Sequence, residues 1–94
     1  LYRLIKRLRG PEGIQWARNQ TPESCTDSIL KEVQDLVQAI DNEDIDNISE
    51  KLGEVLLQIL FHCEMASEEG YFNISNVLTD LYERLIRRHP ELNN

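Results

Sequence analysis

The chain has 94 residues, of which 40% are hydrophobic and 29% are charged, and its formal net charge at pH 7 is −7. Its length and ordinary globular composition predict one domain over residues 1–94. The acidic balance argues against a surface for nucleic acid or anionic membranes. No stretch approaches the ~20 apolar residues of a membrane span, so we expect no nucleic-acid partner and no membrane partner.

The two cysteines indicate the cellular compartment of the protein. Cys25 and Cys63 show neither the spacing of metal ligands nor a disulfide framework. Two reduced thiols are typical of a cytosolic protein, which predicts a cytoplasmic location. Because the first residue is Leu1 and not a methionine, we expect the natural chain to begin upstream.

The hydrophobic periodicity predicts an all-α fold of four helices. The first covers residues 1–8, and a loop that holds Trp16 follows from Gly10 to about Ser24. We expect a capping box over residues 24–27 to start the second helix, which runs to about Ile40. The third helix starts at Asp44 or Asn47 and ends near Glu69.

The last helix is expected to be capped by Asn73 or Ser75 and to end before Pro90. Its apolar residues are expected to point inward: Val77, Leu78, Leu81, Leu85 and Ile86.

The third helix is apolar on more sides than one neighbour can cover. Between Val55 and Phe61 every position except Gln58 is apolar. A four-helix chain of this size supplies too few neighbours to surround such a helix. We therefore expect a homo-oligomer, in its simplest form a dimer, with the third helix in the interface.

Four charged residues are predicted to meet where the second and third helices pair. Glu32 and Asp35 are three residues apart, as are Lys51 and Glu54, so each pair lies on one helical face. A short turn makes the two helices antiparallel neighbours. This register places Asp35 opposite Lys51, and Glu32 opposite Glu54.

At this point the sequence resembles a known family. The segments are Leu-Arg-Gly-Pro-Glu-Gly-Ile-Gln-Trp-Ala-Arg-Asn-Gln-Thr (8–21), Leu-Gly-Glu-Val-Leu-Leu-Gln (52–58), Glu-Glu-Gly-Tyr-Phe (68–72) and Leu-Ile-Arg-Arg-His-Pro (85–90). They resemble MazG-type nucleoside triphosphate pyrophosphohydrolases. The resemblance implies an all-α domain that oligomerises through a helical bundle. It also implies Mg²⁺-dependent hydrolysis of nucleoside triphosphates to nucleoside monophosphates and pyrophosphate.

The family signature is altered in this chain. Glu-Glu-x-x-Glu on one helix and Glu-x-x-Asp on the next become Lys31-Glu32-Val33-Gln34-Asp35 and Lys51-Leu52-Gly53-Glu54. The resemblance therefore places Glu32, Asp35 and Glu54 at metal-ligand positions, with Lys51 at the fourth. The family's Pro-Trp-Asp in the loop reads Gln15-Trp16-Ala17.

Lys51 separates two interpretations of the cluster. An ammonium group has no lone pair for a metal, and it can neutralise the acidic residues itself. We predict that Lys51 stands in for the metal in a structural salt-bridge network. If Lys51 instead pointed into solvent, the three carboxylates would remain open to Mg²⁺.

The candidate substrate-binding residues also admit two interpretations. Trp16 can stack on a nucleotide base or hold the long loop onto the helices. Arg84, Arg87 and Arg88 suit phosphate binding, although cations at a helix C-terminus also favour the helix dipole. The functional alternatives are a pyrophosphohydrolase domain with impaired catalysis and an inactive helical module for dimerisation or for nucleotide or protein binding.

Overall fold

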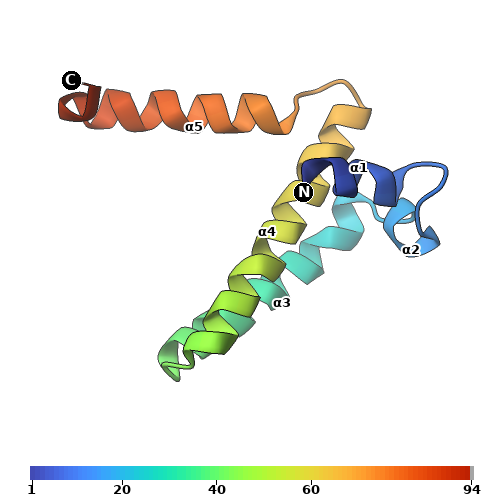
Figure 1. Cartoon of the computed structure of the whole chain (residues 1–94), viewed down its shortest axis with the longest axis horizontal. Helices are drawn as coiled ribbons and strands as arrows, with labels where there is room; N and C mark the ends of the chain where they lie inside the picture. Colours follow the sequence, from blue (N-terminus) through green and yellow to red (C-terminus); the bar gives the residue numbers. More distant parts are fainter. Residues whose placement is uncertain (94) are drawn as a thin grey trace.

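The computed structural model describes residues 1–93, and all of their regular structure is helical (Figure 1). The elements in chain order are α1 (Tyr2–Arg9), α2 (Gln15–Arg18), α3 (Pro22–Asp41), α4 (Ile45–Glu68), α5 (Ile74–Arg88) and a final 3₁₀ turn, η1 (Pro90–Asn93). The predicted all-α class is confirmed. Within residues 1–93, no helix combines the length and the hydropathy needed to cross a membrane.

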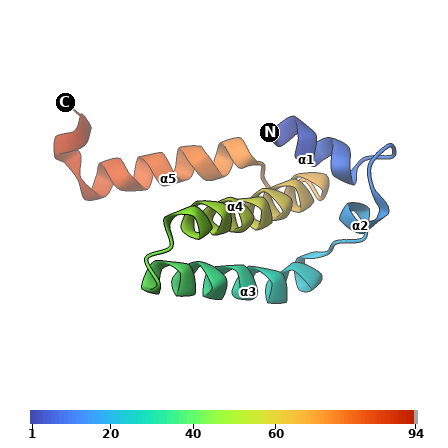
Figure 2. The same ribbon diagram turned by 60° about the horizontal axis from the view of Figure 1, so that its bottom comes forward.

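The antiparallel pair of α3 and α4 forms the body of the molecule. Figures 1 and 2 show the two helices side by side, with α1 and α2 at one end of the pair and the α3–α4 turn at the other. The pairing predicted from the short turn is confirmed. It places the charged residues of α3 and α4 on facing helices.

The start of α3 differs from the prediction. The helix begins at Pro22, and Thr21 is its N-cap. The Ser24 backbone N–H donates to Thr21 Oγ1 at 3.1 Å, and the Thr21 N–H donates to Ser24 Oγ at 2.9 Å. The capping box predicted over residues 24–27 is therefore wrong. Proline favours the first helical position because its missing N–H would be unpaired there anyway.

The beginnings of α4 and α5 each match one of the two alternatives predicted from the sequence. Asp44 caps α4, and its Oδ1 accepts from the Asn47 N–H at 3.3 Å. Gly70 follows the end of α4 with a φ of 76°, which glycine adopts without steric cost. Asn73 caps α5 and forms a capping box with Asn76.

Helix α5 does not fold back onto the body as the sequence led us to expect. It projects away from α3 and α4 (Figure 1), contacts α4 alone among α1–α4, and has no fully buried residue. The predicted inward orientation of its apolar residues is wrong for Leu78, Leu81 and Leu85, all of which are exposed. Its apolar face is available for contacts outside this chain.

The hydrophobic core lies where α1 and α2 cover the end of the α3–α4 pair. Phe61 is 1% exposed and is the largest fully buried side chain. The buried residues around it come from four helices: Ile5, Ala17, Cys25, Leu60 and Met65. The short helices therefore complete a core that α3 and α4 alone could not enclose.

The α3–α4 turn contains an unfavourable backbone conformation. Glu43 has a φ of 55°, and its N–H donates to the Ile40 carbonyl at 3.0 Å. An L-residue with a side chain is disfavoured in this left-handed region, whereas glycine is not. We expect Glu43→Gly to raise the free energy of unfolding by about 0.5–1 kcal/mol in chemical denaturation.

The matched control for Glu43→Gly makes the same substitution inside a helix. Glu50 is exposed within α4, so Glu50→Gly is expected to lower the free energy of unfolding by up to about 1 kcal/mol. A loss of stability in both variants would contradict the assignment of backbone strain to Glu43.

Candidate active site

Lys51 of α4 lies against the two acidic residues of α3. Its Nζ is 3.8 Å from Asp35 Oδ2 and 4.0 Å from Glu32 Oε2, and the three side chains are partly buried. The helix pairing that the sequence predicted brings these groups together. Lys51 points into the cluster and not into bulk solvent.

Asp35 receives a second cation from its own helix. Lys31 Nζ donates to Asp35 Oδ2 at 2.8 Å across one turn of α3. The hydrogen bond from Lys31 lowers the pKa of Asp35, and the charges of Lys31 and Lys51 lower it further. Lys31 and Lys51 thus both favour the ionised form of Asp35.

Glu32 is less completely satisfied than Asp35. Its Oε2 is buried without a hydrogen-bond partner, and Lys51 Nζ at 4.0 Å is too distant to be one. Glu54 lies one turn from Lys51 along α4 and is half-buried. Among residues 1–93, no three His, Cys, Asp or Glu side chains are grouped closely enough to hold a metal ion.

Trp16, on α2, has one side against the core and the other in solvent. Its ring meets Phe61 edge-on, with ring centroids 5.7 Å apart and an interplanar angle of 74°. The side chain is nevertheless 55% exposed. Trp16 therefore helps to hold the loop onto α4, and it also leaves aromatic surface free for stacking.

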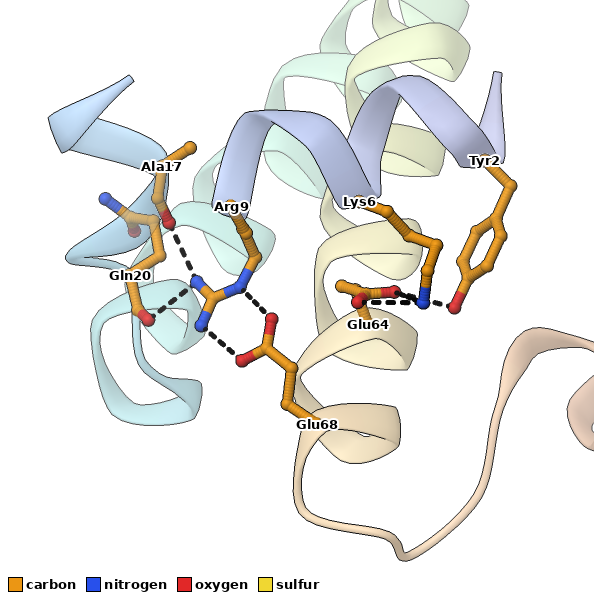
Figure 3. A network of polar contacts seen from close by, with 7 residues as sticks. All are labelled: Tyr2, Lys6, Arg9, Ala17, Gln20, Glu64 and Glu68. Atoms are coloured by element: carbon orange, nitrogen blue, oxygen red, sulfur yellow. Dashed lines mark hydrogen bonds and ion pairs between the residues drawn. The ribbon is translucent and has the colours of Figure 1, made fainter. Parts of the chain in front are cut away.

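Arg9 fixes the position of the segment that carries Trp16 (Figure 3). Its Nε and Nη2 donate to the two carboxylate oxygens of Glu68 at 2.8 and 2.9 Å. Its Nη1 donates to the carbonyl oxygens of Ala17 and Gln20 at 2.8 and 2.9 Å. One guanidinium group thus joins α1, α4 and both sides of the α2 C-terminus. The hydrogen bond to Arg9 lowers the pKa of Glu68.

A second contact between α1 and α4 lies one turn away. Glu64 is only 5% exposed. Its Oε2 accepts a hydrogen bond of 2.8 Å from the Tyr2 hydroxyl, and Lys6 Nζ lies 3.3 Å from its Oε1 (Figure 3). We did not identify Arg9 or Glu64 from the sequence. The available signal was the spacing of residues 2, 6 and 9 on α1, which matches two acidic residues one turn apart on α4.

The burial of Tyr2 has an expected consequence at high pH. Desolvation, together with the hydrogen bond to Glu64, raises the pKa of Tyr2 to about 12. The unfolded tyrosine ionises near 10, so its stabilising contribution is complete below pH 10 and is lost as the pH rises toward 12. Titration of tyrosinate absorbance should show an ionisation near pH 12 that is missing from Tyr2→Phe. An unchanged titration in that variant would contradict this assignment.

Within a single chain, the C-terminal arginines lie far from the Lys51 cluster. Arg84, Arg87 and Arg88 are exposed near the end of α5, which projects away from α3 (Figure 1). Arg84 Nε lies 3.6 Å from Asp80 Oδ2 on the same helix. Within one chain, the arginines and the acidic cluster do not form a single site.

The family of the chain follows from a comparison with known domains. A family model described as the MazG nucleotide pyrophosphohydrolase domain matches residues 20–93. The chain belongs to this MazG family. The match includes all of α3, α4 and α5, and therefore the whole Lys51 cluster.

Several relatives of this MazG domain have names that state an activity, and two of them are described here. Nucleoside triphosphate pyrophosphohydrolase/pyrophosphatase MazG of Thermotoga maritima is 45% identical over 92 residues, which are 98% of this chain and 36% of the relative. Nucleoside triphosphate pyrophosphohydrolase of Escherichia coli is 36% identical over 93 residues, which are 98% of this chain and 35% of the relative.

The relatives also include a protein with no stated activity. Uncharacterized protein YabN of Bacillus subtilis is 43% identical over 89 residues, which are 95% of this chain and 18% of the relative. The MazG domain described here thus spans between about a fifth and just over a third of the length of these three proteins.

Proposed function

We propose that this MazG domain is a nucleoside triphosphate pyrophosphohydrolase domain with impaired catalysis. The family activity converts a nucleoside triphosphate to a nucleoside monophosphate and pyrophosphate with the aid of Mg²⁺. The observation that carries the proposal is the position of Lys51 Nζ, within 4.0 Å of both Asp35 and Glu32. An ammonium group there takes the place of a family metal ligand.

The acidic cluster offers Mg²⁺ some of the ligands that it requires, but it also contains a cation. Mg²⁺ needs oxygen ligands in octahedral geometry, and Glu32, Asp35 and Glu54 are the residues that could supply them. Glu32 Oε2, which is buried without a hydrogen-bond partner, would suit a metal. Lys51 does not, because a unit charge at 4 Å repels a divalent ion by about 8 kcal/mol at an effective dielectric of 20. With Lys51 in this position the residues do not fit Mg²⁺.

We propose that the residues for binding the base and the phosphates of a nucleotide are kept, although the metal site is not. The exposed surface of Trp16 offers a stacking face for a base. Arg84, Arg87 and Arg88 offer bidentate contacts to phosphates. Nucleoside triphosphates are therefore the proposed ligands. Two buried free cysteines support a cytoplasmic location.

The second candidate function is an inactive helical module. Its support is the exposed apolar side chains of α5 and, on α4, of Leu52, Leu56 and Ile59. Such surface marks a protein interaction site. In this proposal the MazG domain forms a homodimer, and nucleotide or protein binding is kept while turnover is lost.

The test is pyrophosphate release from a panel of ribonucleoside and deoxyribonucleoside triphosphates, with and without Mg²⁺. We expect turnover far below the usual range of enzymes, about 1–10³ s⁻¹. Nucleotide binding is measured in parallel by quenching of Trp16 fluorescence. Turnover within the usual range would overturn the proposed impairment. Absence of any measurable turnover, with or without nucleotide binding, would favour the helical module.

A further inference from the structure

The orientation of the Trp16 ring depends on the backbone that carries it. The indole meets Phe61 edge-on, and 55% of the side chain is exposed, so more than half of it lies outside the core. A base stacks well on a ring whose face is open and whose orientation is fixed before the base arrives. The segment around Trp16 therefore has to supply part of that order.

Helix α2, which carries Trp16, is too short to supply this order by itself. It has four residues, Gln15–Arg18, and isolated helices shorter than about 12 residues are marginal in water. Ala17 anchors one side of α2 in the core, where it is 0% exposed. A helix leaves its last carbonyl groups without partners in its own backbone ladder, so the C-terminal end of α2 is stabilised by donors from other parts of the chain.

Arg9 of α1 supplies two of these donor contacts. Its Nη1 donates to the carbonyl oxygen of Ala17 at 2.8 Å and to that of Gln20 at 2.9 Å (Figure 3). The side chain of Gln20 in turn donates through Nε2 to the Trp16 carbonyl at 3.1 Å. The backbone of Trp16 is thus connected to Arg9 by two routes, one through Ala17 and one through Gln20.

Glu68 of α4 fixes the guanidinium group that makes these contacts. It accepts from Arg9 Nε and Nη2 at 2.8 and 2.9 Å, which leaves Nη1 directed at the two carbonyl oxygens (Figure 3). The Arg9 side chain is only 10% exposed, and a bidentate ion pair holds the guanidinium plane in one orientation. A lysine ammonium has no such planar fork. Glu68 therefore acts on Trp16 through Arg9.

We propose that Arg9 and Glu68 are positioning residues that present the Trp16 ring to the base of a bound nucleoside triphosphate. The ring makes the stacking contact, and the guanidinium group determines where that contact is made. This inference rests on the proposed function and deepens it, because it assigns the residues that control how much the base contributes to binding. Arg9 and Glu68 themselves touch neither the base nor the phosphates.

Calorimetric titration with ATP and with inorganic tripolyphosphate, both without Mg²⁺, separates the contribution of the base from that of the phosphates. Loss of one aromatic stacking contact corresponds to about 5- to 150-fold in Kd. Arg9→Lys is expected to weaken ATP binding about fivefold or more and to leave the Kd for tripolyphosphate within about twofold of the wild type. Glu68→Gln should act in the same direction but less strongly, because Nη1 keeps its two carbonyl acceptors.

The control variant breaks the neighbouring contact between α1 and α4. Lys6 Nζ lies 3.3 Å from Glu64 Oε1, one helical turn from Arg9. Lys6→Met loosens the same pair of helices without removing a donor from α2, so it should leave the Kd of both ligands unchanged. Circular dichroism of every variant reports whether the helices remain folded.

A second measurement needs no nucleotide. Trp16 is the only tryptophan of the chain, so the decay of fluorescence anisotropy reports the nanosecond motion of this one indole. Arg9→Lys should increase the amplitude of that motion, whereas Lys6→Met should not. An unchanged decay in Arg9→Lys would overturn the positioning role whatever the titrations show.

The titrations distinguish this inference from the proposed function. A wild-type chain that binds neither ATP nor tripolyphosphate would overturn nucleotide binding and the positioning role together. ATP binding that is weakened by Trp16→Ala but not by Arg9→Lys would overturn the positioning role alone. Equal weakening of ATP and tripolyphosphate in Arg9→Lys would show that Arg9 only supports the fold, which also overturns the positioning role.

Discussion

Replacing Lys51 with glutamate is expected to make the MazG domain respond to Mg²⁺. The substitution removes the ammonium that lies 3.8 Å from Asp35 and 4.0 Å from Glu32, and it supplies a carboxylate in its place. Without metal the variant should be less stable than the wild type, because the acidic side chains of α3 and α4 then repel one another. With Mg²⁺ at a hundred times its Kd, ligand binding to the folded state adds about 2.7 kcal/mol of stability.

Thermal melting measures this response to Mg²⁺ without depending on activity. For a domain of this size the gain corresponds to a rise of roughly 10–20 °C in Tm. The wild type should show no shift. Arg3→Glu makes a similar charge change on exposed surface of α1 and should behave as the wild type does. A wild-type shift as large as that of Lys51→Glu would mean that Lys51 does not exclude the ion.

The second large effect is a loss of stability, which we expect when the core residue Phe61 is replaced. Phe61 is 1% exposed and meets the edge of the Trp16 ring. Replacing it with alanine leaves a cavity between α1, α2, α3 and α4, which is expected to lower the free energy of unfolding by about 3–5 kcal/mol. Native proteins are stable by only about 5–15 kcal/mol, so Phe61→Ala should melt far below the wild type.

Two independent measurements follow the effect of Phe61→Ala. Chemical denaturation gives the stability loss, and the Trp16 emission should shift to longer wavelength because the indole loses its core contact. Tyr71 is 76% exposed, so Tyr71→Ala should change stability by no more than about 0.5 kcal/mol. Equal losses in the two variants would contradict the placement of the core.

The sequence predicts this fold well where short-range rules decide it. The α3–α4 pairing follows from a short turn and two amphipathic patterns, and it correctly brings Lys51 to Asp35. The start of α3 was misplaced because two overlapping cap signals compete, and the signal of Thr21 followed by Pro22 prevails. Local propensity could not rank them without the position of the core.

Long-range contacts account for what the sequence did not reveal. The role of Arg9 depends on carbonyl groups of residues 17 and 20 and on Glu68, which lies 59 positions away. No periodicity identifies which carbonyl groups a guanidinium will meet. The prediction of the α5 orientation was wrong for a related reason. An amphipathic pattern predicts that a helix face will be covered, but it does not say whether the covering residues belong to the same chain.

The lack of buried residues in α5 has a consequence for its dynamics. An isolated helix of about 12–15 residues is only marginally stable in water, and α5 has 15 residues with its capping box at Asn73 and Asn76. Its amide protons should therefore exchange with solvent through local opening, well before those of α4. A slowing of amide exchange that is confined to α5 would then show that another molecular surface has packed against this helix.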